Sequence, residues 1–363
     1  MGEPIIEESK QNDSNHTTSD IIPSVIKTTE IYSPEMMKLY YTYLFPSSLL
    51  FNWLSYNNTE PIENREFSFT LVGDIYIRYC SFNTRDEFKH GLISKLPEKI
   101  DIGAIYNCSP AQHNVVNNFQ PISKELIFDI DMTDYNDVRK CCVEASVCEN
   151  CWLYMTAALK LLDYVLREDF GFEHILWIYS GRRGIHAHIC DQNARILTND
   201  IRTGIVDYLS VYVASKGNDM NKVQISTPIH PMLNTAYNIL EPYYNQLVQR
   251  QQLLDTNGCK LLLNQLDDKL AGDVSDVLTA DDTTDYANIH LDRFNSFKSR
   301  IQSILTKHNI RQKKNPQTID YVNSARTAVQ KAVFSTVYPR LDANVSKQMN
   351  HLLKSPFCVH PKV

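Results

Sequence analysis

ELIFDIDMTDYNDVRKCCVEASVCENC, residues 125–151, places two aspartates at the end of a short apolar run and four cysteines soon after them. Side chains at positions i and i+2 of a strand project from one face. A strand over residues 125–131 would therefore present Asp129 and Asp131 together, while Ile130 points into the core. Hard divalent cations such as Mg²⁺ bind one or two carboxylates of this kind together with substrate phosphates. The alternative is a pair of surface carboxylates that only aid solubility.

The cysteines of this stretch form a dense group. Cys148 and Cys151 have the C-x₂-C spacing that grips zinc from one side, and Cys141 and Cys142 lie just before them. Four thiolates would close a structural zinc site, with a redox thiol cluster as the alternative. The other five cysteines are isolated, and we expect core or surface thiols at Cys80, Cys108, Cys190, Cys259 and Cys358.

The composition is that of a globular protein. The chain has 363 residues, 43% of them hydrophobic, which predicts one large domain with an insertion or two domains. No apolar stretch approaches a membrane-spanning length, and the N-terminus lacks a secretory signal. We therefore expect an intracellular protein with reduced thiols, which favours metal binding over disulfides.

Two strand–turn–strand patterns flank the aspartates. Residues 67–82 alternate apolar and polar side chains on both sides of a Gly-Asp turn, which predicts a β-hairpin whose return strand carries Tyr76 and Arg78 on one face. Residues 174–191 repeat the pattern around the turn SGRRG.

The second turn supplies cations that a triphosphate requires. Arg182 and Arg183 can each form forked hydrogen bonds to phosphate oxygens, and Ser180 can donate a further one. His186 and His188 share one strand face, so alternation does not separate them. An ordinary basic hairpin tip is the alternative. A second group of cations lies near the C-terminus at His351, Lys354 and His360.

Asp342 is a third candidate metal ligand. We expect it in a late strand, RLDANV, flanked by Leu341 and Val345. Burying an unpaired charge is strongly unfavourable, so this carboxylate needs a partner. A metal shared with Asp129 and Asp131 is one candidate, and a neighbouring Arg340 is the other.

The rest of the chain is predicted to form a tail and helices. Residues 1–32 are polar and predict a flexible tail, and residues 40–53 and 152–170 have helical spacing, the first broken at Pro46 and the second ending at Gly171. Residues 192–330 are poor in strand patterns, which predicts an all-helical insertion. Residues 251–292 carry a balance of −7 and residues 293–363 a balance of +11. This asymmetry suits an anionic partner near the C-terminal part, or a solvated helix face.

Several motifs occur together and in order: REFSFTL, IDIGAIY, FDIDMTDY, CCVEASVCENCW, EDFGF, YSGRRGIH, YPRLDANVSK and NHLLKSPFCVHPK. This series resembles the catalytic small subunit of eukaryotic DNA primase, in the archaeo-eukaryotic primase superfamily. The match runs from about Tyr40 to Lys362 and is weakest in the helical insertion. Relative to that family, the N-terminal tail is longer and few residues follow the last motif.

The resemblance implies an α/β (α+β) primase core. It is an RRM-like catalytic unit with an inserted all-helical subdomain and a small structural zinc motif at residues 141–151. The implied boundaries are a tail at 1–32, core at 33–191, helical insertion at 192–330 and core again at 331–363.

The resemblance also implies the site residues. Asp129, Asp131 and Asp342 match the family's Mg²⁺ or Mn²⁺ ligands. Ser180, Arg182, Arg183, His186, His351, Lys354 and His360 match triphosphate-binding positions. Glu66, Tyr76, Arg78, Lys99 and Asp101 match motifs around the nucleotide and the primer end. Cys141, Cys142, Cys148 and Cys151 match the zinc ligands.

The implied activity is template-directed synthesis of RNA primers from ribonucleoside triphosphates on single-stranded DNA, with two catalytic metal ions. The implied partners are a larger regulatory primase subunit and the replicative DNA polymerase that extends the primers, in the nucleus. Two other hypotheses fit parts of the pattern. A nucleotide-sugar transferase would use the Asp129–Asp131 pair without Asp342, and a zinc-dependent nucleic-acid-binding module would need none of the aspartates.

Overall fold

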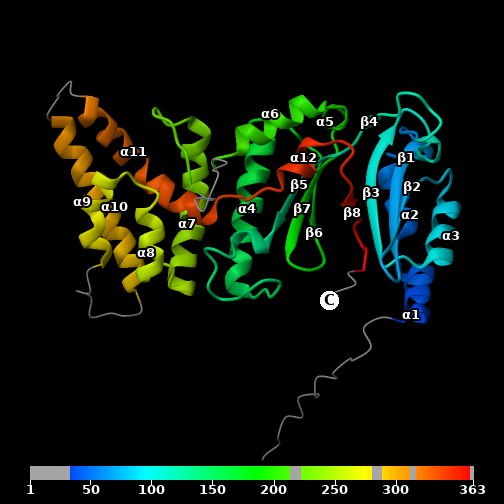
Figure 1. The fold of residues 1–363 in the computed structure, drawn as a ribbon, viewed down its shortest axis with the longest axis horizontal. Coiled ribbons are helices and arrows are strands. Elements are labelled where there is room, and N and C mark those ends of the chain that lie inside the picture. Colours follow the sequence, from blue (N-terminus) through cyan, green and yellow to red (C-terminus); the bar gives the residue numbers. More distant parts are fainter. Residues whose placement is uncertain (1–32, 213–221, 280–287, 311–315, 360–363) are drawn as a thin grey trace, which may run out of the picture.

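The structure of the protein is a computed structural model that describes residues 33–212, 222–279, 288–310 and 316–359. Two antiparallel sheets and a group of long helices follow one another along the longest axis of the molecule (Figure 1). Among the described residues, no helix is long and apolar enough to cross a lipid bilayer.

The first sheet has the strand order β2-β1-β3-β4, and β8 also pairs with β3. Its hairpin confirms the strand pattern predicted for residues 67–82, with Gly73 and Asp74 in the left-handed region at the turn. The strands are β1 (Arg65–Leu71), β2 (Ile75–Cys80), β3 (Lys99–Tyr106), β4 (Pro121–Ser123) and β8 (Leu353–Lys354).

N-terminal helices cover one face of this sheet. Phe67 and Phe69 of β1 are fully buried against them, in a core that includes Phe51 and Phe88. The break expected at Pro46 is confirmed, because a helix begins at the residue after it. The covering elements are α1 (Pro34–Leu39), the π-helical turn η1 (Tyr40–Leu44), α2 (Ser47–Leu54) and α3 (Arg85–Lys95), with the short 3₁₀ turns η2 (Ile62–Asn64) and η3 (Pro110–Gln112) at the edges.

The second sheet has the order β5-β7-β6 and confirms the other predicted strands. In β5, Phe128 and Ile130 are buried, and Asp129 and Asp131 lie on the opposite face. A long helix packs against the apolar face, and Gly171 follows its end with φ +70°, as expected of a helix stop. The elements are β5 (Leu126–Asp131), the 3₁₀ turn η4 (Met132–Tyr135), α4 (Glu149–Glu168), β6 (Ile175–Tyr179) and β7 (Gly184–Ile189).

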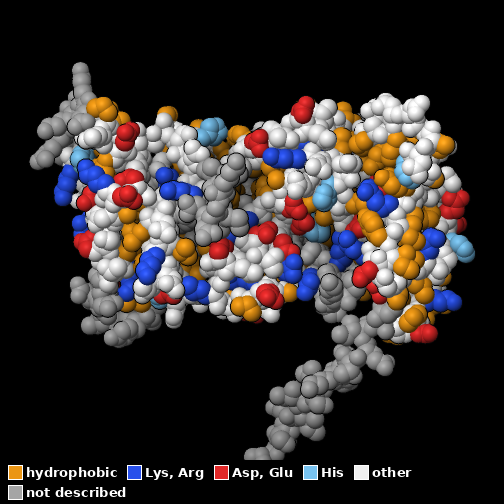
Figure 2. Space-filling model, in the orientation of Figure 1, with side chains coloured by type: hydrophobic (Ala, Val, Ile, Leu, Met, Phe, Trp, Pro, Cys, Tyr) orange, Lys and Arg blue, Asp and Glu red, His pale blue; other side chains and the backbone are white. Residues whose placement is uncertain are grey.

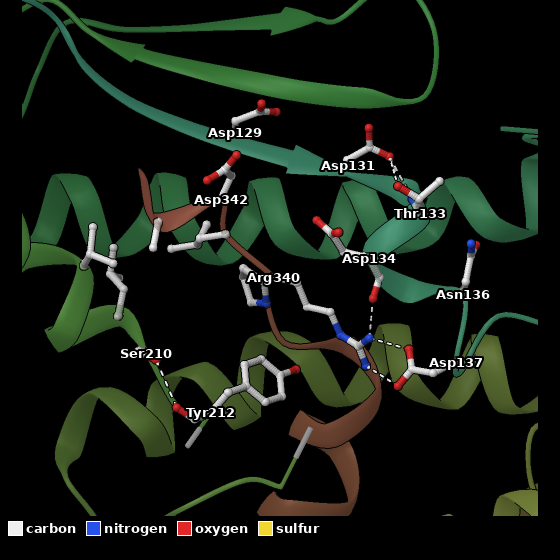
Figure 3. Close-up of a pocket in the computed structure, with 15 residues that line it drawn as sticks. Asp129, Asp131, Thr133, Asp134, Asn136, Asp137, Ser210, Tyr212, Arg340 and Asp342 are labelled. Atoms are coloured by element: carbon white, nitrogen blue, oxygen red, sulfur yellow. Dashed lines mark hydrogen bonds and ion pairs between the residues drawn. The ribbon is translucent and has the colours of Figure 1, made fainter. Parts of the chain in front are cut away.

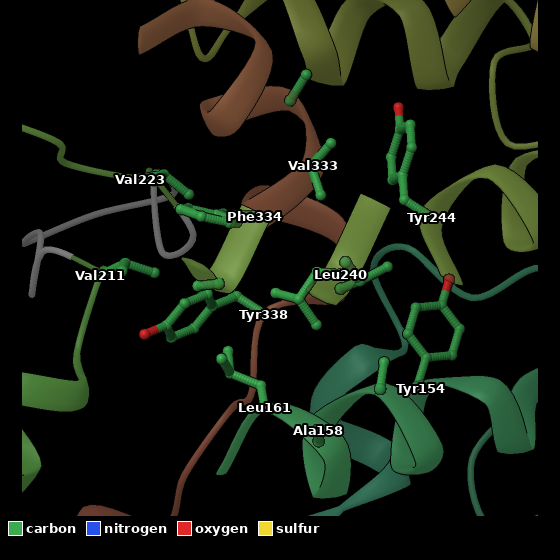
Figure 4. Close-up of a cluster of buried hydrophobic side chains, with 14 of the residues drawn as sticks. Tyr154, Ala158, Leu161, Val211, Val223, Leu240, Tyr244, Val333, Phe334 and Tyr338 are labelled. Carbon is green, nitrogen blue, oxygen red and sulfur yellow. The ribbon is translucent and has the colours of Figure 1, made fainter. Parts of the chain in front are cut away.

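Helices make up the described part of residues 192–330, apart from one isolated bridge between Tyr212 and Val223. Leu240 and Tyr244 of one helix and Phe334 of another pack on α4, so these helices share a core with the second sheet (Figure 4). The helices are α5 (Gln192–Arg195), α6 (Asn199–Leu209), α7 (Pro231–Gln251), α8 (Thr256–Leu263), α9 (Asp268–Thr279), α10 (Ile289–Ile310) and α11 (Pro316–Val337).

The strand expected around Asp342 is wrong. Helix α11 runs through residue 330 and ends at Val337, and α12 (Ala343–Lys347) begins directly after Asp342. Val333, Phe334 and Val337 are buried at helical spacing, and that burial extends the helix into a segment whose composition favours strands. Asp342 caps α12, since its Oδ1 accepts a hydrogen bond from the Asn344 N–H at 3.0 Å.

Candidate active site

The three predicted carboxylates lie together. Asp129 and Asp131 project from one face of β5, and the segment before α12 runs beside that strand. The Asp342 N–H donates a hydrogen bond to the Asp129 carbonyl at 3.0 Å. A backbone contact between residues more than two hundred positions apart therefore brings the late carboxylate to the early pair, as the close-up shows (Figure 3).

Negative charge is concentrated at this point. Burial, followed by the charges of the neighbouring carboxylates Asp342, Asp131 and Asp134, raises the pKa of Asp129 to about 7. Burial also favours the neutral form of Asp131, but hydrogen bonds from Arg183 and Thr133 outweigh it and hold the pKa of Asp131 below its usual value. Carboxylates that oppose one another's ionisation in this way form a suitable site for divalent cations.

Asp134 was not singled out from the sequence. It belongs to η4, which turns the chain back towards the end of β5, and its pKa is raised by burial and then by Asp131. The signal in the sequence was its position three residues after Asp131. In the structure, the N–H and the hydroxyl of Thr133, between the two aspartates, bond to the Asp131 carboxylate.

The turn between β6 and β7 faces the carboxylates. Arg183 Nε lies 2.7 and 2.8 Å from the two oxygens of Asp131. Ser180 Oγ accepts a hydrogen bond from the Gly184 N–H at 3.0 Å, and Gly181 has φ +86°, which favours glycine. This turn brings the guanidinium of Arg183 to the edge of the metal-ligand candidates.

The two histidines of β7 differ. His186 Nε2 lies 3.4 Å from Asp129 Oδ1, and its pKa is lowered to about 4, mainly by burial and then by Lys354. His188 is fully buried behind it, with Trp53 edge-on to its ring at 5.4 Å. Of the pair that alternation left unresolved, His186 is therefore the one at the site.

The cleft that holds these groups lies between the two sheets and has a volume of about 360 Å³. Lys354 of β8 crosses it, and its Nζ donates to the Ser180 carbonyl at 3.3 Å. In the space-filling view, acidic, basic and histidine side chains meet where the sheets adjoin (Figure 2). The polar side chains that line the cleft are Lys99, Asp101, Asp129, Asp131, Ser180, Arg182, Arg183, His186, Asp342, His351 and Lys354.

Three predicted residues of the first sheet do not line this cleft. Glu66 is fully buried, with Arg78 Nε at 2.9 Å and the Tyr106 hydroxyl at 3.1 Å. The Ser68 hydroxyl donates a hydrogen bond to Asp101 at 3.2 Å, and it lies 3.1 Å from the Tyr76 hydroxyl. Tyr76 is thus linked through Ser68 to Asp101, which lines the cleft. His360 lies outside the described residues.

A larger cavity of about 750 Å³ opens on the other side of the carboxylates. Arg340 lies in its wall, and its guanidinium binds the Asp137 carboxylate and the Asp134 and Ser335 carbonyls (Figure 3). The alternative reading, in which Arg340 neutralises Asp342, is therefore wrong. This leaves the Asp342 carboxylate directed to the Asp129 side of the site.

The four cysteines lie together at the start of α4. The Sγ atoms of Cys141, Cys142, Cys148 and Cys151 are all within 4.8 Å of one another. Burial raises the pKa of the Cys148 thiol, but hydrogen bonds from the Cys151 backbone and from neighbouring thiols outweigh it and lower the pKa to about 7. Four soft donors grouped around a common point are the donor set of a structural zinc site.

Comparisons with known proteins agree with this geometry. Residues 128–363 match the sequence model of the family described as DNA primase small subunit. Three curated proteins named DNA primase small subunit are similar over most of the chain. The one from Drosophila melanogaster is 37% identical over 99% of this chain and 81% of its own length.

The two yeast relatives are comparably similar. The protein from Schizosaccharomyces pombe is 40% identical over 90% of this chain and 70% of its own length. The one from Saccharomyces cerevisiae is 33% identical over 90% of this chain and 78% of its own length. By the family match and by these relatives, the chain belongs to the DNA primase small subunit family.

Proposed function

We propose that the cleft between the carboxylates and the arginine turn is the polymerisation site of a DNA primase. As a member of the DNA primase small subunit family, the chain is a nucleotidyltransferase that synthesises RNA primers for DNA replication. The observation that carries the site assignment is the hydrogen bond between Asp342 and Asp129, which groups three carboxylates opposite a set of cations.

In this proposal, Asp129, Asp131 and Asp342 hold two Mg²⁺ or Mn²⁺ ions. Such ions supply charge neutralisation at an attacking 3′-hydroxyl and at a departing pyrophosphate. The protein's own contribution is geometric, because β5 and the α12 cap fix the carboxylates before substrate binds. Arg183 belongs to the turn and bonds to Asp131. This contact fixes the position of the phosphate-binding cations relative to the carboxylates.

The triphosphate of the incoming ribonucleotide is assigned to the cations across the cleft. Arg182 and Arg183 provide forked donors, and Ser180 and Lys354 lie at the same turn. His186 and His351 line the cleft between these groups and the carboxylates. His360 is assigned to the same group from its motif.

The first sheet is assigned to the nucleotide and the primer end. Lys99 and Asp101 line the cleft as an ion pair at 3.0 Å, and Glu66, Tyr76 and Arg78 are assigned to the same group from their motifs. The second sheet with α4 is the RRM-like catalytic unit. The helical insertion is assigned to residues 192–330, between core segments 33–191 and 331–363.

Further assignments follow from the family. A small subunit implies a large primase subunit as partner. We also assign single-stranded DNA as template, ribonucleoside triphosphates as substrates, the replicative DNA polymerase as the enzyme that extends the primers, and the nucleus as location. One structural zinc ion is assigned to the four cysteines. The sugar-transferase hypothesis and the non-catalytic zinc-module hypothesis have no support from the family match.

The direct test is incorporation of ribonucleotides on single-stranded DNA with Mn²⁺, comparing the wild type with Asp129→Ala. We expect template-dependent incorporation by the wild type and a loss of at least about a hundredfold in the variant. Template-independent activity, or equal incorporation by a folded Asp129→Ala protein, would reject this function.

A further inference from the structure

Lys124 is a buried cation that the proposed reaction does not use. Its side chain is 1% exposed, and its Nζ donates a hydrogen bond of 2.5 Å to the carbonyl of His351. Among the described residues, that carbonyl is the acceptor for the ammonium. Burial, followed by the charge of Arg202, lowers the pKa of Lys124 to about 7. Burying an ammonium group costs free energy unless the group makes a specific interaction, and for Lys124 that interaction is the hydrogen bond to His351.

The hydrogen bond joins the two places where the chain passes between the sheets. Lys124 and Glu125 connect β4 of the first sheet with β5 of the second, and residues 348–352 connect α12 with β8 of the first sheet. Both connections run close together beside β4 and α12 (Figure 1). The first carries the chain to the aspartates, and the second contains His351 and leads to Lys354.

The first connection is rigidly held. Arg202 of α6 is fully buried and donates to the Lys124 carbonyl at 2.5 Å and to the Glu125 carbonyl at 3.1 Å. The Glu125 carboxylate accepts two hydrogen bonds of 3.0 Å from buried Arg65 of β1 and one of 2.6 Å from Tyr56. The backbone at Lys124 is therefore held in place, and the side chain that carries the ammonium extends from it.

The second connection is anchored at its two ends by other contacts. The Met349 N–H donates to Asn199 Oδ1 at 3.1 Å, and Lys354 lies in β8, paired with Asp101 of β3. His351 lies between these anchors, where its own N–H makes a long turn hydrogen bond of 3.3 Å to the Gln348 carbonyl. The contact with Lys124 is therefore the one that fixes the middle of the connection.

We propose that Lys124 is a positioning residue for nucleotide binding, which holds His351 at the cleft by fixing its backbone. This inference rests on the proposed function, because His351 is assigned there to the triphosphate. His351 is one of the residues that line the cleft, and its carbonyl accepts the hydrogen bond from Lys124. Without the ammonium, the part-buried carbonyl loses this hydrogen bond, and the connection shifts to find another donor.

Lys124→Met removes the donor while keeping most of the side-chain volume. We expect the KM for ribonucleotides to rise about tenfold, the effect of losing one hydrogen bond that involves a charged group. We expect kcat to change by less than about threefold, since the carboxylates do not move. Lys298→Met is the matched control, because it removes a lysine paired with Glu241 in the helical region and should leave KM unchanged.

A double-mutant cycle separates positioning from general stability. If Lys124 acts through His351, Lys124→Met should raise KM by less than about twofold in a His351→Ala background. An equal rise in both backgrounds, or an unchanged KM in folded Lys124→Met, overturns the proposal. So does an unchanged KM in His351→Ala alone. Failure of the proposed function itself is recognised separately, by full activity of Asp129→Ala.

A second variant covers the case in which Lys124→Met does not fold. Lys124→Gln retains a donor on a shorter side chain without the charge, so a KM above that of the wild type, by less than about tenfold, is expected. A folded Lys124→Gln protein with wild-type KM in a nucleotide titration would overturn a positioning role for the charge. Circular dichroism and the Tm of each variant establish that folded protein is compared.

Discussion

At the scale of single residues, the site depends on opposing charges held at fixed positions. Asp131 bonds to Arg183 on one side, whereas Asp129 faces Asp342 and has a pKa raised to about 7. The sequence pattern predicts Asp129 and Asp131 as a pair, because alternation in a strand is a local property. It does not predict that Arg183 binds Asp131, since that contact depends on how β5 and β7 align.

Arg183 provides a test at this scale. Replacing it with Lys keeps a positive charge but loses the planar guanidinium, whose Nε lies 2.7 and 2.8 Å from the two oxygens of Asp131. We expect Arg183→Lys to raise the nucleotide KM about tenfold, and Arg183→Ala to raise it further. Steady-state incorporation kinetics measure both. A wild-type KM in the Lys variant would mean that only the charge matters.

Glu125 links pH to stability. Burial raises its pKa, but the Arg65 guanidinium and the Tyr56 hydroxyl outweigh burial and lower it to about 2. A carboxyl with a depressed pKa in the folded state stabilises above its unfolded pKa of about 4.5 and loses that stabilisation as the pH falls towards 2. The amount involved is about 3 kcal/mol.

We therefore expect the free energy of unfolding of the wild type to fall steeply between about pH 4.5 and 2, and Glu125→Gln to lack this component of the fall. Denaturant titrations at several pH values measure it. Parallel pH profiles for the two proteins would show that Glu125 contributes no pH-dependent stability.

At the scale of secondary structure, prediction succeeded where neighbouring residues decide the conformation. Both hairpins and the helix before Gly171 were predicted, because their turns and their periodicity are local. The strand expected around Asp342 was wrong, because burial of Phe334 and Val337 keeps the chain helical up to Val337 and Asp342 is the N-cap of the next helix, α12. Packing between helices distant in sequence decided that element, and no local pattern records it.

The cysteine loop before α4 is a second test at this scale. If its four thiols hold zinc, Cys148→Ser should lose stoichiometric zinc in elemental analysis and lower the Tm by several degrees. Cys80→Ser is the matched control, because Cys80 is an isolated, partly exposed cysteine of β2. Wild-type protein that is free of zinc and equally stable would contradict the zinc assignment.

At the scale of the whole molecule, the cleft forms because two separate sheets face each other. Lys99 and Asp101 come from the first sheet, whereas the aspartates of β5 and the arginine turn come from the second. Each of these groups was predicted separately from the sequence, and the family resemblance implied that they form one site. The distances between these groups depend on the two connections between the sheets, at Lys124 and at residues 348–352. No periodicity in the sequence predicts the path of these connections.

The most direct test of the account is the activity of Asp342→Asn. Asparagine caps helices as well as aspartate does, so α12 should stay intact while the third carboxylate is lost. We predict a folded protein with a wild-type Tm whose ribonucleotide incorporation on single-stranded DNA falls by at least about a hundredfold. Incorporation at the wild-type rate would show that Asp342 is not a ligand of the catalytic ions, and would contradict the three-carboxylate site.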